Sequence, residues 1–561
     1  MPNMEFPLLS KTTNCRNCYK CIRNCPVKAI SFFENKATII SDECILCGHC
    51  YLYCPQGVKV IRDDLVKVNS FLFLKEKVVI SLAPSFLANY PGVSIKSFKK
   101  AAIKAGFYDV EETAVGATIV KNKYDEMLND NNRDVIISSC CHSINLLIEK
   151  YYPEALPFLA DILSPMCAHG KDIKERLGKD TKVVFVGPCI AKKDEADHSE
   201  YIDAALSYAE FDKLLENNNI ELEIDNDVLI EKSKARLFPT CGGVLKTMAK
   251  ANPNYQYLAI DGVRNAKKAL QDIIDGKIHH CFVEMSTCAG SCINGPLVNP
   301  THRAVLEGSL NVNKNAGQLD FDVNNDCDIS TTYHSYNTVA SLPSENEINE
   351  MLIKMGKAKE SDQLNCGSCG YPSCREKAIA IIQGKAVVEM CLPYLMNKAN
   401  SLSDKLVNAS IEGLMVIDEE LNIKLINSAM CHMVRISHPE DVLNKKVYLL
   451  FDGNDFVSCL QEKKSIKSKV SFLAEYNKYL EMSILYDDEY HLLICVCRDI
   501  TEDVVAHSEK EERINKTISL TEEILNRNLA AVQEIASLLG ENAASTKVAL
   551  NRIKETIKDD K

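Results

Sequence analysis

The sequence lacks the features that would point to a membrane or to nucleic acid. None of its stretches approaches the roughly 20 uncharged apolar residues that a bilayer-spanning helix needs, and its first residues do not form a charged segment followed by an apolar one, as a secretion signal does. Acidic residues outnumber basic ones, 77 to 65, and the basic residues form no long block. Nucleic acid is therefore not expected as the main partner. We expect a cytoplasmic chain with no membrane segment.

Tryptophan is missing altogether, whereas cysteine is abundant, with 25 residues. A hydrophobic content of 46% with 25% charged residues excludes wholesale disorder. The length of 561 residues suggests roughly four folded units at about 150 residues each. Because no secretion signal is present, a disulfide framework is not expected, and metal or redox chemistry is the better explanation for the cysteines.

Eight cysteines lie in two short runs near the N-terminus. Each run reads C-x2-C-x2-C-x3-C-P and ends in Pro26 or Pro55. This spacing brings three thiolates to one iron–sulfur cluster, while the fourth binds the neighbouring cluster. A pair of zinc sites is the alternative, but zinc prefers two separated C-x2-C pairs. Residues 1–70 resemble a bacterial two-cluster ferredoxin. The predicted ligands are Cys15, Cys18, Cys21 and Cys54 for one [4Fe–4S] cluster and Cys44, Cys47, Cys50 and Cys25 for the other.

Four more cysteines form a set far downstream, namely Cys366, Cys369, Cys374 and Cys391. Gly367 and Gly370 permit tight turns, and residues 375–388 predict a helix that returns Cys391 to the other three. The set resembles a small [4Fe–4S] domain found beside electron-transfer and corrinoid proteins, which we place at 346–400. A zinc ion remains an alternative, because four thiolates satisfy either metal.

The middle of the chain, residues 75–345, alternates short β-branched runs with amphipathic stretches. The runs KVVISLAP, DVIISSCC, KVVFVGPC and HHCFVEMSTC predict strands, and three of them end directly in cysteine. Segments such as SIKSFKKAAIKAGF and INLLIEKYY predict helices between strands, so we expect two α/β lobes. Ligands in such sheets gather beyond the carboxyl ends of the strands. The cysteines are therefore expected to meet at one site.

These motifs carry a family resemblance. SSCCHS at 138–143, GPCIAKKDE at 187–195 and EMSTCAGSCINGP at 284–296 resemble, in order, the three signature segments of the [FeFe]-hydrogenase catalytic domain. FPTCGGVL at 238–245 resembles a segment that lines the cofactor. The resemblance implies an H-cluster, in which a [4Fe–4S] cluster is bridged to a two-iron subsite with carbon monoxide, cyanide and dithiolate ligands.

The resemblance also implies roles for individual residues. Cys292 would both hold the [4Fe–4S] part and bridge to the two-iron subsite. Cys140 matches the proton-relay thiol, Lys192 the donor to a cyanide ligand, and Glu195 the residue that supports this lysine. The implied ligands of the [4Fe–4S] part are Cys141, Cys189, Cys288 and Cys292.

Elementary chemistry agrees with these roles. Thiolates bind soft iron, and a cationic lysine favours an anionic ligand in a buried pocket. A weakly acidic thiol is able to pass protons near neutral pH. The plainer alternatives are that Cys140 is a buried packing residue and that Lys192 is an ordinary surface lysine.

Several positions depart from the family pattern. His142 stands where catalytic members carry proline, and Gly187 replaces a methionine. Tyr124 occupies the place of an acidic relay residue, and Ala160 that of a relay serine. These changes keep the metal ligands but alter the pocket lining and the outer proton path. We therefore expect slow or biased turnover.

Residues 401–505 change character. VNASIEGLMVIDEELNIKLINSAM predicts a helix, a strand, a turn at 418–422 and another strand, and HLLICVCRDITED predicts a closing strand. The order and the RDITE ending resemble a PAS domain. Its cysteines lack ligand spacing and are expected to pack in the core. His432 as an axial haem ligand is a weak alternative. The cysteines concerned are Cys431, Cys459, Cys495 and Cys497.

The last segment, 506–561, is predicted to be helical. Leu525, Leu529, Val532, Ala536 and Leu539 step by four and three residues and form an apolar seam. A glycine at position 540 is expected to end this helix before a last one, STKVALNRIKETIK. Either the helix packs on its own domain, or it forms a dimeric coiled coil or a signalling surface. No kinase, cyclase, phosphatase or DNA-binding motif follows, so any output would pass to a separate protein such as a kinase or phosphatase.

Together these features predict a multidomain α/β, [FeFe]-hydrogenase-like protein of the sensory type. It would interconvert H2 with protons and electrons slowly and relay the redox state through three further [4Fe–4S] clusters and the PAS-like domain. The expected partners are H2, protons, a ferredoxin-type electron carrier, cofactor maturation proteins and a second copy in a homodimer. The alternatives are a metabolic ferredoxin-linked hydrogenase and an iron–sulfur redox scaffold that never receives the two-iron site.

Overall fold

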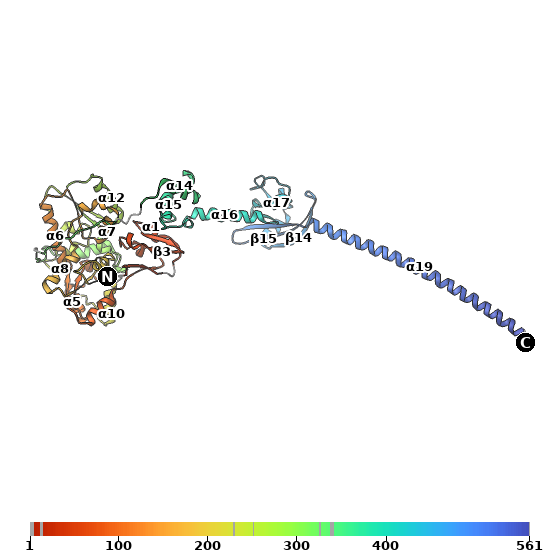
Figure 1. The fold of residues 1–561 in the computed structure, drawn as a ribbon, viewed down its shortest axis with the longest axis horizontal. Helices are drawn as coiled ribbons and strands as arrows, with labels where there is room; N and C mark the ends of the chain where they lie inside the picture. The colour runs from red at the N-terminus through yellow and green to blue at the C-terminus, as the bar shows by residue number, and fades with distance from the viewer. Residues whose placement is uncertain are drawn as a thin grey trace. The chain divides into compact units, whose positions relative to one another are not determined.

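The computed structural model describes residues 5–11, 15–227, 230–250, 252–324, 327–336 and 341–559. The chain divides into two compact units, residues 1–395 and 396–561, which Figure 1 colours from red to blue along the sequence. Among the described residues, every helix is too short or too polar to cross a bilayer.

The first unit begins with two small antiparallel sheets and two short helices. The predicted cysteine runs wrap around these helices, α1 and α2, which contain Cys21 and Cys50. Strand β1 pairs with β4, and β2 pairs with β3. The bounds are β1 Leu8–Ser10, α1 Lys20–Asn24, β2 Ile30–Phe33, β3 Lys36–Ile39, α2 His49–Leu52 and β4 Lys59–Ile61.

Two parallel sheets follow, which confirms the prediction of an α/β arrangement in two lobes. One has the strand order β6-β5-β8-β9 and the other β10-β11-β7. The central strands β5 and β11 are buried along their whole length, as expected for a parallel sheet covered by helices. The bounds are β5 Val78–Leu82, β6 Asp109–Glu112, β7 Val135–Ile137, β8 Lys182–Val186, β9 Ala204–Leu206, β10 Gln256–Asp261 and β11 Cys281–Ser286.

Amphipathic helices connect these strands at the predicted places. Ser94 caps helix α5, where its side chain accepts a hydrogen bond from the Ser97 N–H. The bounds are α3 Leu65–Phe73, α4 Phe86–Asn89, α5 Ile95–Lys104, α6 Ala114–Asn129, α7 His142–Tyr151, α8 Pro165–Leu177, α9 Ala191–Asp197, α10 Tyr208–Asn217, α11 Gly243–Thr247, α12 Val263–Ile274 and α13 Val305–Lys314.

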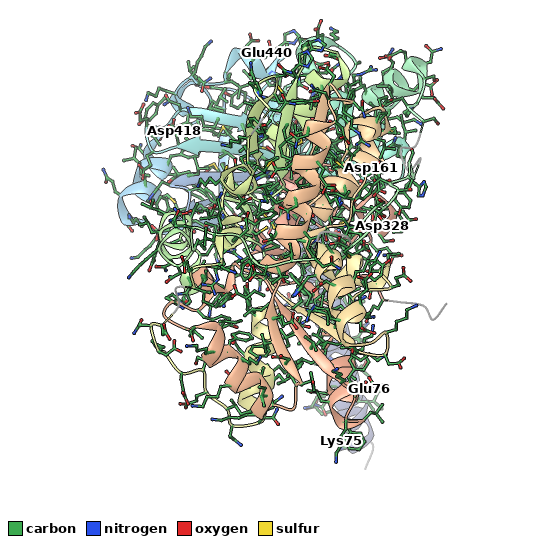
Figure 2. The ribbon with its side chains drawn as sticks, turned by 90° about the vertical axis from the view of Figure 1, so that its left-hand side faces the viewer. Lys75, Glu76, Asp161, Asp328, Asp418 and Glu440 are labelled. Carbon is green, nitrogen blue, oxygen red and sulfur yellow. The ribbon has the colours of Figure 1, made fainter. Side chains whose placement is uncertain are left out.

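After α13, the chain around 329–331 pairs with the residues around 161–163. The Thr331 N–H donates to the Asp161 carbonyl at 2.9 Å, and the Leu163 N–H donates to the Ile329 carbonyl at 2.8 Å. Figure 2 labels Asp161 and the neighbouring Asp328, which lie close together in that view.

The small domain that follows contains helices α14 (Glu345–Lys354) and α15 (Cys374–Ile382). The prediction of one helix over 375–388 was too long. Helix α15 ends at Ile382, because Gly384 adopts a left-handed φ of 72° and turns the chain. A short 3-10 turn, Val388–Met390, then leads to Cys391.

The second unit contains a five-stranded antiparallel sheet with the strand order β13-β12-β16-β15-β14. The predicted strand, turn and strand appear as β12 and β13, and the predicted closing strand as β16. The bounds are α16 Leu392–Ala409, β12 Gly413–Asp418, β13 Ile423–Ile426, α17 Ser428–Met433, α18 Asn454–Glu462, β14 Ile466–Leu473, β15 Lys478–Asp487 and β16 Leu492–Asp499.

The cysteines of this unit are packing residues, as predicted. All four lie buried in one apolar core, namely Cys431, Cys459, Cys495 and Cys497. His432, in contrast, is exposed. The structure therefore contradicts the weak alternative that His432 faces the core as a haem ligand.

The chain continues as a single helix, α19 (Thr501–Asp559). The prediction that Gly540 ends a helix was wrong, because α19 runs through it. A glycine inside a helix costs about 1 kcal/mol relative to alanine, and good helix formers on both sides outweigh this cost. The helix also does not pack along its own domain, because all its described side chains from 505 to 555 are exposed.

Candidate functional site

A cavity of about 120 Å³ lies where the two parallel sheets face each other. Its wall is formed by residues that follow β5, β7 and β8 and by the end of β11. These are the carboxyl ends of the strands, where the sequence placed the ligand site. The lining includes Cys140, Cys141, Cys189, Lys192 and Cys292.

Three of the four cysteines predicted to hold one cluster line this cavity, and the fourth, Cys288, lies near them. Burial raises the pKa of Cys288, and the charges of Cys189 and Cys141 raise it further. Burial likewise raises the pKa of Cys292, followed by the charges of Cys141, Cys288 and Cys189. Each sulfur therefore lies close enough to the others to affect its ionisation. Cys292 is exposed in the structure and contributes to the lining of the cavity.

Close backbone packing brings two of the cysteine loops together. A Cβ atom on Gly295 would lie 2.7 Å from the carbonyl oxygen of Pro188 and 3.0 Å from that of Cys292. Only glycine permits this approach. The loop that contains Cys292 is therefore held against the loop that contains Cys189.

Lys192 reaches the cavity from the first turn of α9. Its Nζ lies 2.5 Å from Glu195 Oε2 and 3.0 Å from Ser164 Oγ, and it donates to the Cys140 carbonyl at 3.4 Å. Burial alone would lower the pKa of Lys192, but the charges of Glu195 and Cys167 and the hydrogen bond to Glu195 together outweigh burial, and the pKa is raised. Burial alone would raise the pKa of Glu195, but Lys192 lowers it. Both groups are therefore charged at neutral pH, and the alternative of a surface lysine is contradicted.

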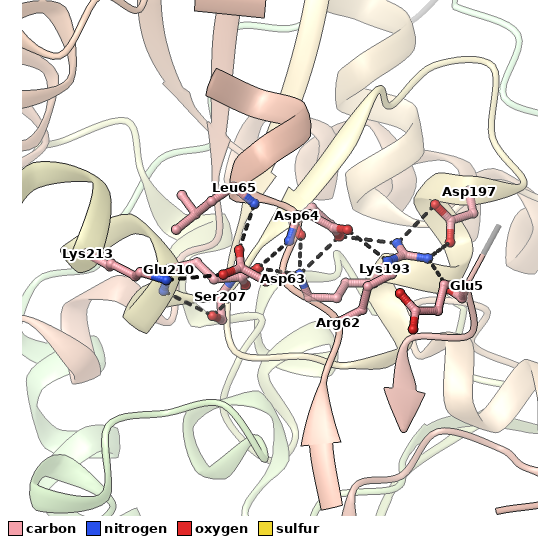
Figure 3. A network of polar contacts seen from close by, with 11 residues as sticks. Glu5, Arg62, Asp63, Asp64, Leu65, Lys193, Asp197, Ser207, Glu210 and Lys213 are labelled. Carbon is pink, nitrogen blue, oxygen red and sulfur yellow. Dashed lines mark hydrogen bonds and ion pairs between the residues drawn. The ribbon is translucent and has the colours of Figure 1, made fainter. Parts of the chain in front are cut away.

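The next residue, Lys193, turns to the opposite side of α9 and is buried. Its Nζ lies 3.0 Å from Asp64 Oδ2 and 2.9 Å from Glu210 Oε1, and it donates to the Ala205 carbonyl at 2.8 Å. Arg62 extends the network, with contacts of 2.8 Å to Asp64 and 2.6 Å to Asp197. Figure 3 shows these contacts from close by. The network ties α9 to the strand end at 61–64, and no motif in the sequence indicated it.

Cys140 lies at the cavity wall beside Tyr124. The Tyr124 hydroxyl is 3.2 Å from Cys140 Sγ and accepts a hydrogen bond from the Ser139 N–H at 2.9 Å. Burial raises the pKa of Cys140 to about 12, so the free thiol keeps its proton at neutral pH. The tyrosine found in place of an acidic relay residue thus contacts the thiol directly. Ala160 is buried in the nearby core.

Glu284 also lines the cavity, although the sequence did not mark it as a candidate site residue. Its carboxylate accepts a hydrogen bond from the Leu245 N–H at 3.2 Å. Burial raises the pKa of Glu284 to about 7. The signal that could have found it is a charged residue inside the otherwise apolar strand CFVEMS. His142 lines the cavity as well and pairs with Asp194 at 2.8 Å.

The position of Cys25 agrees with the predicted exchange of one cysteine between the two N-terminal runs. Burial raises the pKa of Cys44 to about 12 and raises that of Cys47, and the charge of Cys25 raises both further. Cys25 therefore lies near the second run rather than its own. Burial also raises the pKa of Cys21, and the charges of Cys15 and Cys18 add to it. The assignment of Cys54 to the cluster of the first run stays a prediction.

The downstream cysteines surround a second small cavity, of about 20 Å³. Its lining contains all four members of the set, Cys366, Cys369, Cys374 and Cys391. Lys377 also lines it and is almost completely buried. Burial lowers the pKa of this lysine, while the charges of Cys369 and Cys391 oppose that shift.

The three cysteine regions pack against one another within the first unit. Gly48 adopts a φ of 77°, and a Cβ atom on it would lie 2.5 Å from Pro296 Cβ and 3.0 Å from Ile190 Cδ1. The loop between Cys44 and Cys50 thus contacts the residues that follow Cys189 and Cys292. On the other side, Lys28 Nζ donates to the Gly370 carbonyl at 2.9 Å.

Comparisons with known proteins agree with this arrangement. Residues 76–296 match the family described as the iron only hydrogenase large subunit, C-terminal domain. Residues 14–58 match a 4Fe-4S dicluster domain, and residues 362–393 match a putative Fe-S cluster family. The central and N-terminal parts of the chain are therefore similar to hydrogenase and iron–sulfur domains.

Individual relatives are distant. The chain is 26% identical over 371 residues to iron hydrogenase 1 from Clostridium pasteurianum, which covers 51% of this chain and 64% of that protein. A solved variant of the [FeFe]-hydrogenase from Chlamydomonas reinhardtii is similar with a TM-score of 0.36 and 17% identity, over 45% of this chain and 90% of the other. The PAS domain of nitrogen regulation protein NR(II) from Vibrio parahaemolyticus is similar with a TM-score of 0.16 and 18% identity, over 18% of this chain and 98% of the other.

Proposed function

We propose that this chain is an [FeFe]-hydrogenase-like oxidoreductase that converts H2 reversibly into two protons and two electrons. The observation that carries the proposal is that four cysteines lie close together and three of them line one cavity, which a charged, largely buried lysine also lines. The four are Cys141, Cys189, Cys288 and Cys292.

The residues present fit the implied cofactor. Four cysteine sulfurs suit iron, because thiolates favour soft metals. The cavity beside these sulfurs leaves room for a further group, and the amine of Lys192 in its wall suits an anionic ligand. When bound, an H-cluster would supply the metal centre at which H2 is cleaved.

The chain's own residues would position this group and handle charge. Lys192 would donate a hydrogen bond to an anionic ligand, and Glu195 holds the amine in place and keeps it protonated. Cys140 would hold a proton at Sγ at the cavity wall, next to the hydroxyl of Tyr124. The apolar part of the wall, including Phe185 and Phe238, would exclude water.

We also propose a route for the two electrons. They would leave through the loop between Cys44 and Cys50, which packs on Ile190 and Pro296 beside the cavity. They would then pass between the two N-terminal clusters and on to the set at 366–391. Gly370 packs closely against Ile22, because a Cβ atom added to Gly370 would lie 3.0 Å from Ile22 Cγ2. This contact between the two cysteine regions supports the proposed order.

The sensory part of the proposal concerns the second unit. Cys391 directly precedes helix α16, which leads into the five-stranded sheet at Gly413. We propose that residues 401–505 form a PAS-like domain that reports the redox state of the first unit to a signalling partner. The strand order in which β12 lies between β13 and β16 supports a sensor domain with a compact core.

Cluster reduction by H2 tests this function. The matured protein, kept free of oxygen, should lose iron–sulfur absorbance under H2, whereas Cys141→Ser and Cys189→Ser should not respond. Cys241→Ser is the matched control, because Cys241 lies in a neighbouring loop but does not line the cavity. If the Cys141 variant is reduced by H2 as fast as the Cys241 variant, the proposed function is wrong.

A further inference from the structure

Helix α19 presents an apolar face that its own unit does not cover. The helix is joined to the sheet at its start, where the Thr501 hydroxyl accepts a hydrogen bond from the Tyr479 N–H at 2.9 Å. Further along, Ile518 is 51% exposed and Val532 is 62% exposed. Burial of such side chains is favourable, and long helices owe most of their stability to packing of an apolar face. The helix is therefore built to pack against a partner.

The apolar residues follow a heptad repeat. With Ile518 as position a, the spacing of three and four residues places Ile514 and Ile535 at position d. This spacing of 3.5 residues is typical of left-handed coiled coils. The a positions from 518 to 553 are Ile518, Leu525, Val532, Leu539, Thr546 and Ile553.

Charge is distributed in the way such an interface requires. Between 518 and 553, the a, d, e and g positions contain only two charged residues, Glu522 and Arg552. The outward b, c and f positions contain five, which are Glu523, Arg527, Glu534, Glu541 and Lys547. The inward face is therefore almost free of charge and is apolar mainly at its a, e and g positions, whereas the d row also contains the polar residues Thr521, Asn528 and Asn542. The outward face stays solvated.

This face is complementary to itself in a parallel arrangement. In a parallel dimer, a g residue lies near the e residue five positions later in the partner helix. Ile524 would then meet Leu529 of the second copy, and Thr517 would meet Glu522 of the second copy, so no like charges face each other. Asn528 occupies a d position and would meet its own equivalent, where two amides can hydrogen-bond. Such a polar residue in the seam fixes register and the number of strands.

We propose that α19 pairs in parallel and in register with α19 of a second copy of this chain, through the seam from Ile514 to Ile553. This interface lies in α19, apart from the cysteine regions, and does not depend on them. It would make the dimer the form in which the C-terminal unit meets a signalling protein.

The mass of the full chain in solution tests the proposal. Light scattering after gel filtration should give about twice the 62.6 kDa of one chain. Val532→Lys places a charge in the seam and should raise the dissociation constant of the dimer at least about a hundredfold. Ala530→Lys adds the same charge two residues away, at an outward f position, and should leave the dimer unchanged. A monomeric or tetrameric parent chain, or equal masses for the two variants, would overturn the proposal.

A second variant covers the case in which Val532→Lys fails to fold. Asn528→Leu replaces a polar seam residue with leucine, which suits a d position of a two-stranded coiled coil. It should lower the dissociation constant of the dimer, and an unchanged or higher value contradicts the seam. Energy transfer between dyes on the C-termini of two copies should be strong for parallel helices, and its absence contradicts the parallel orientation.

Discussion

Lys192 and Lys193 are neighbours in the chain, but their amines bind partners on opposite sides of α9. The Nζ of Lys192 lies 2.5 Å from Glu195 at the cavity, and the Nζ of Lys193 lies 3.0 Å from Asp64 in a buried network. The second contact fixes the helix that holds the first amine. The two neighbouring lysines of one motif therefore differ in role: Lys192 lines the cavity, whereas Lys193 holds α9 in position.

The Lys193 network should matter greatly for stability. Lys193→Met leaves Glu210 without its cation and Asp64 with Arg62 alone, and removal of one partner of a buried ion pair costs about 3–5 kcal/mol. Lys213→Met is the control, because Lys213 pairs with Asp63 at the surface, where a pair is worth about 0–1 kcal/mol. Urea unfolding followed through iron–sulfur absorbance measures both. Equal midpoints for the two variants would contradict the assignment.

Removal of the cavity amine should impair the reaction without unfolding the protein. Lys192→Gln loses a hydrogen bond from a charged donor, worth about 1.5–3 kcal/mol, so H2 oxidation should fall at least about tenfold. Lys96→Gln, at an exposed surface pair, should keep the parent rate. H2-dependent reduction of an artificial electron acceptor gives both rates. A Lys192→Gln variant that keeps the parent rate would show that the amine does not act at the cofactor.

The contact between the ferredoxin-like domain and the cavity loops should control electron transfer. Gly48→Ala introduces a Cβ atom 2.5 Å from Pro296 Cβ and should displace the cluster loop, so reduction of the N-terminal clusters by H2 should slow several-fold. Gly57→Ala is a matched control, because Gly57 also has a positive φ but no atom lies within 4 Å of its added Cβ. Stopped-flow absorbance measures the rates. Equal rates in the two variants would argue against electron exit through this loop.

Glu284 should make stability depend on pH. Burial raises its pKa from 4.5 to about 7 in the folded protein, so between these values the folded state binds more protons than the unfolded state. The free energy of unfolding should therefore fall as the pH rises from about 5 to 7, through this residue, by up to about 3 kcal/mol. Glu284→Gln should remove that part of the slope. Urea unfolding of the cofactor-free protein at several pH values checks this, and an unchanged slope in the variant contradicts the assignment.

The sequence predicted the features that depend on local pattern. Cysteines at the ends of β7 and β8 follow β-branched runs, and the rule that parallel strands point their carboxyl ends to one edge was enough to bring Cys141 and Cys189 together. An apolar face on α19 was visible for the same reason, although the register in which it pairs was not. Each of these features needs only a short stretch of chain.

The features that were missed depend on contacts between distant residues. Lys193 meets Asp64 across 129 positions, and nothing in the sequence near either residue indicates the pair. Glu284 becomes notable only because the loop at Leu245 covers it. At Gly540 the expectation failed for another reason, since one unfavourable residue is not enough to end a helix with strong formers on both sides.

The central claim is that Cys141, Cys189, Cys288 and Cys292 hold one cofactor beside the amine of Lys192. The infrared spectrum of the matured protein tests it most directly, because metal-bound carbon monoxide and cyanide absorb where the protein does not. The account predicts both sets of bands in the parent chain, their loss in Cys292→Ser, and a shift of the cyanide bands alone in Lys192→Gln. A matured parent chain that binds iron but shows neither carbon monoxide nor cyanide bands would contradict the account and leave an iron–sulfur electron relay.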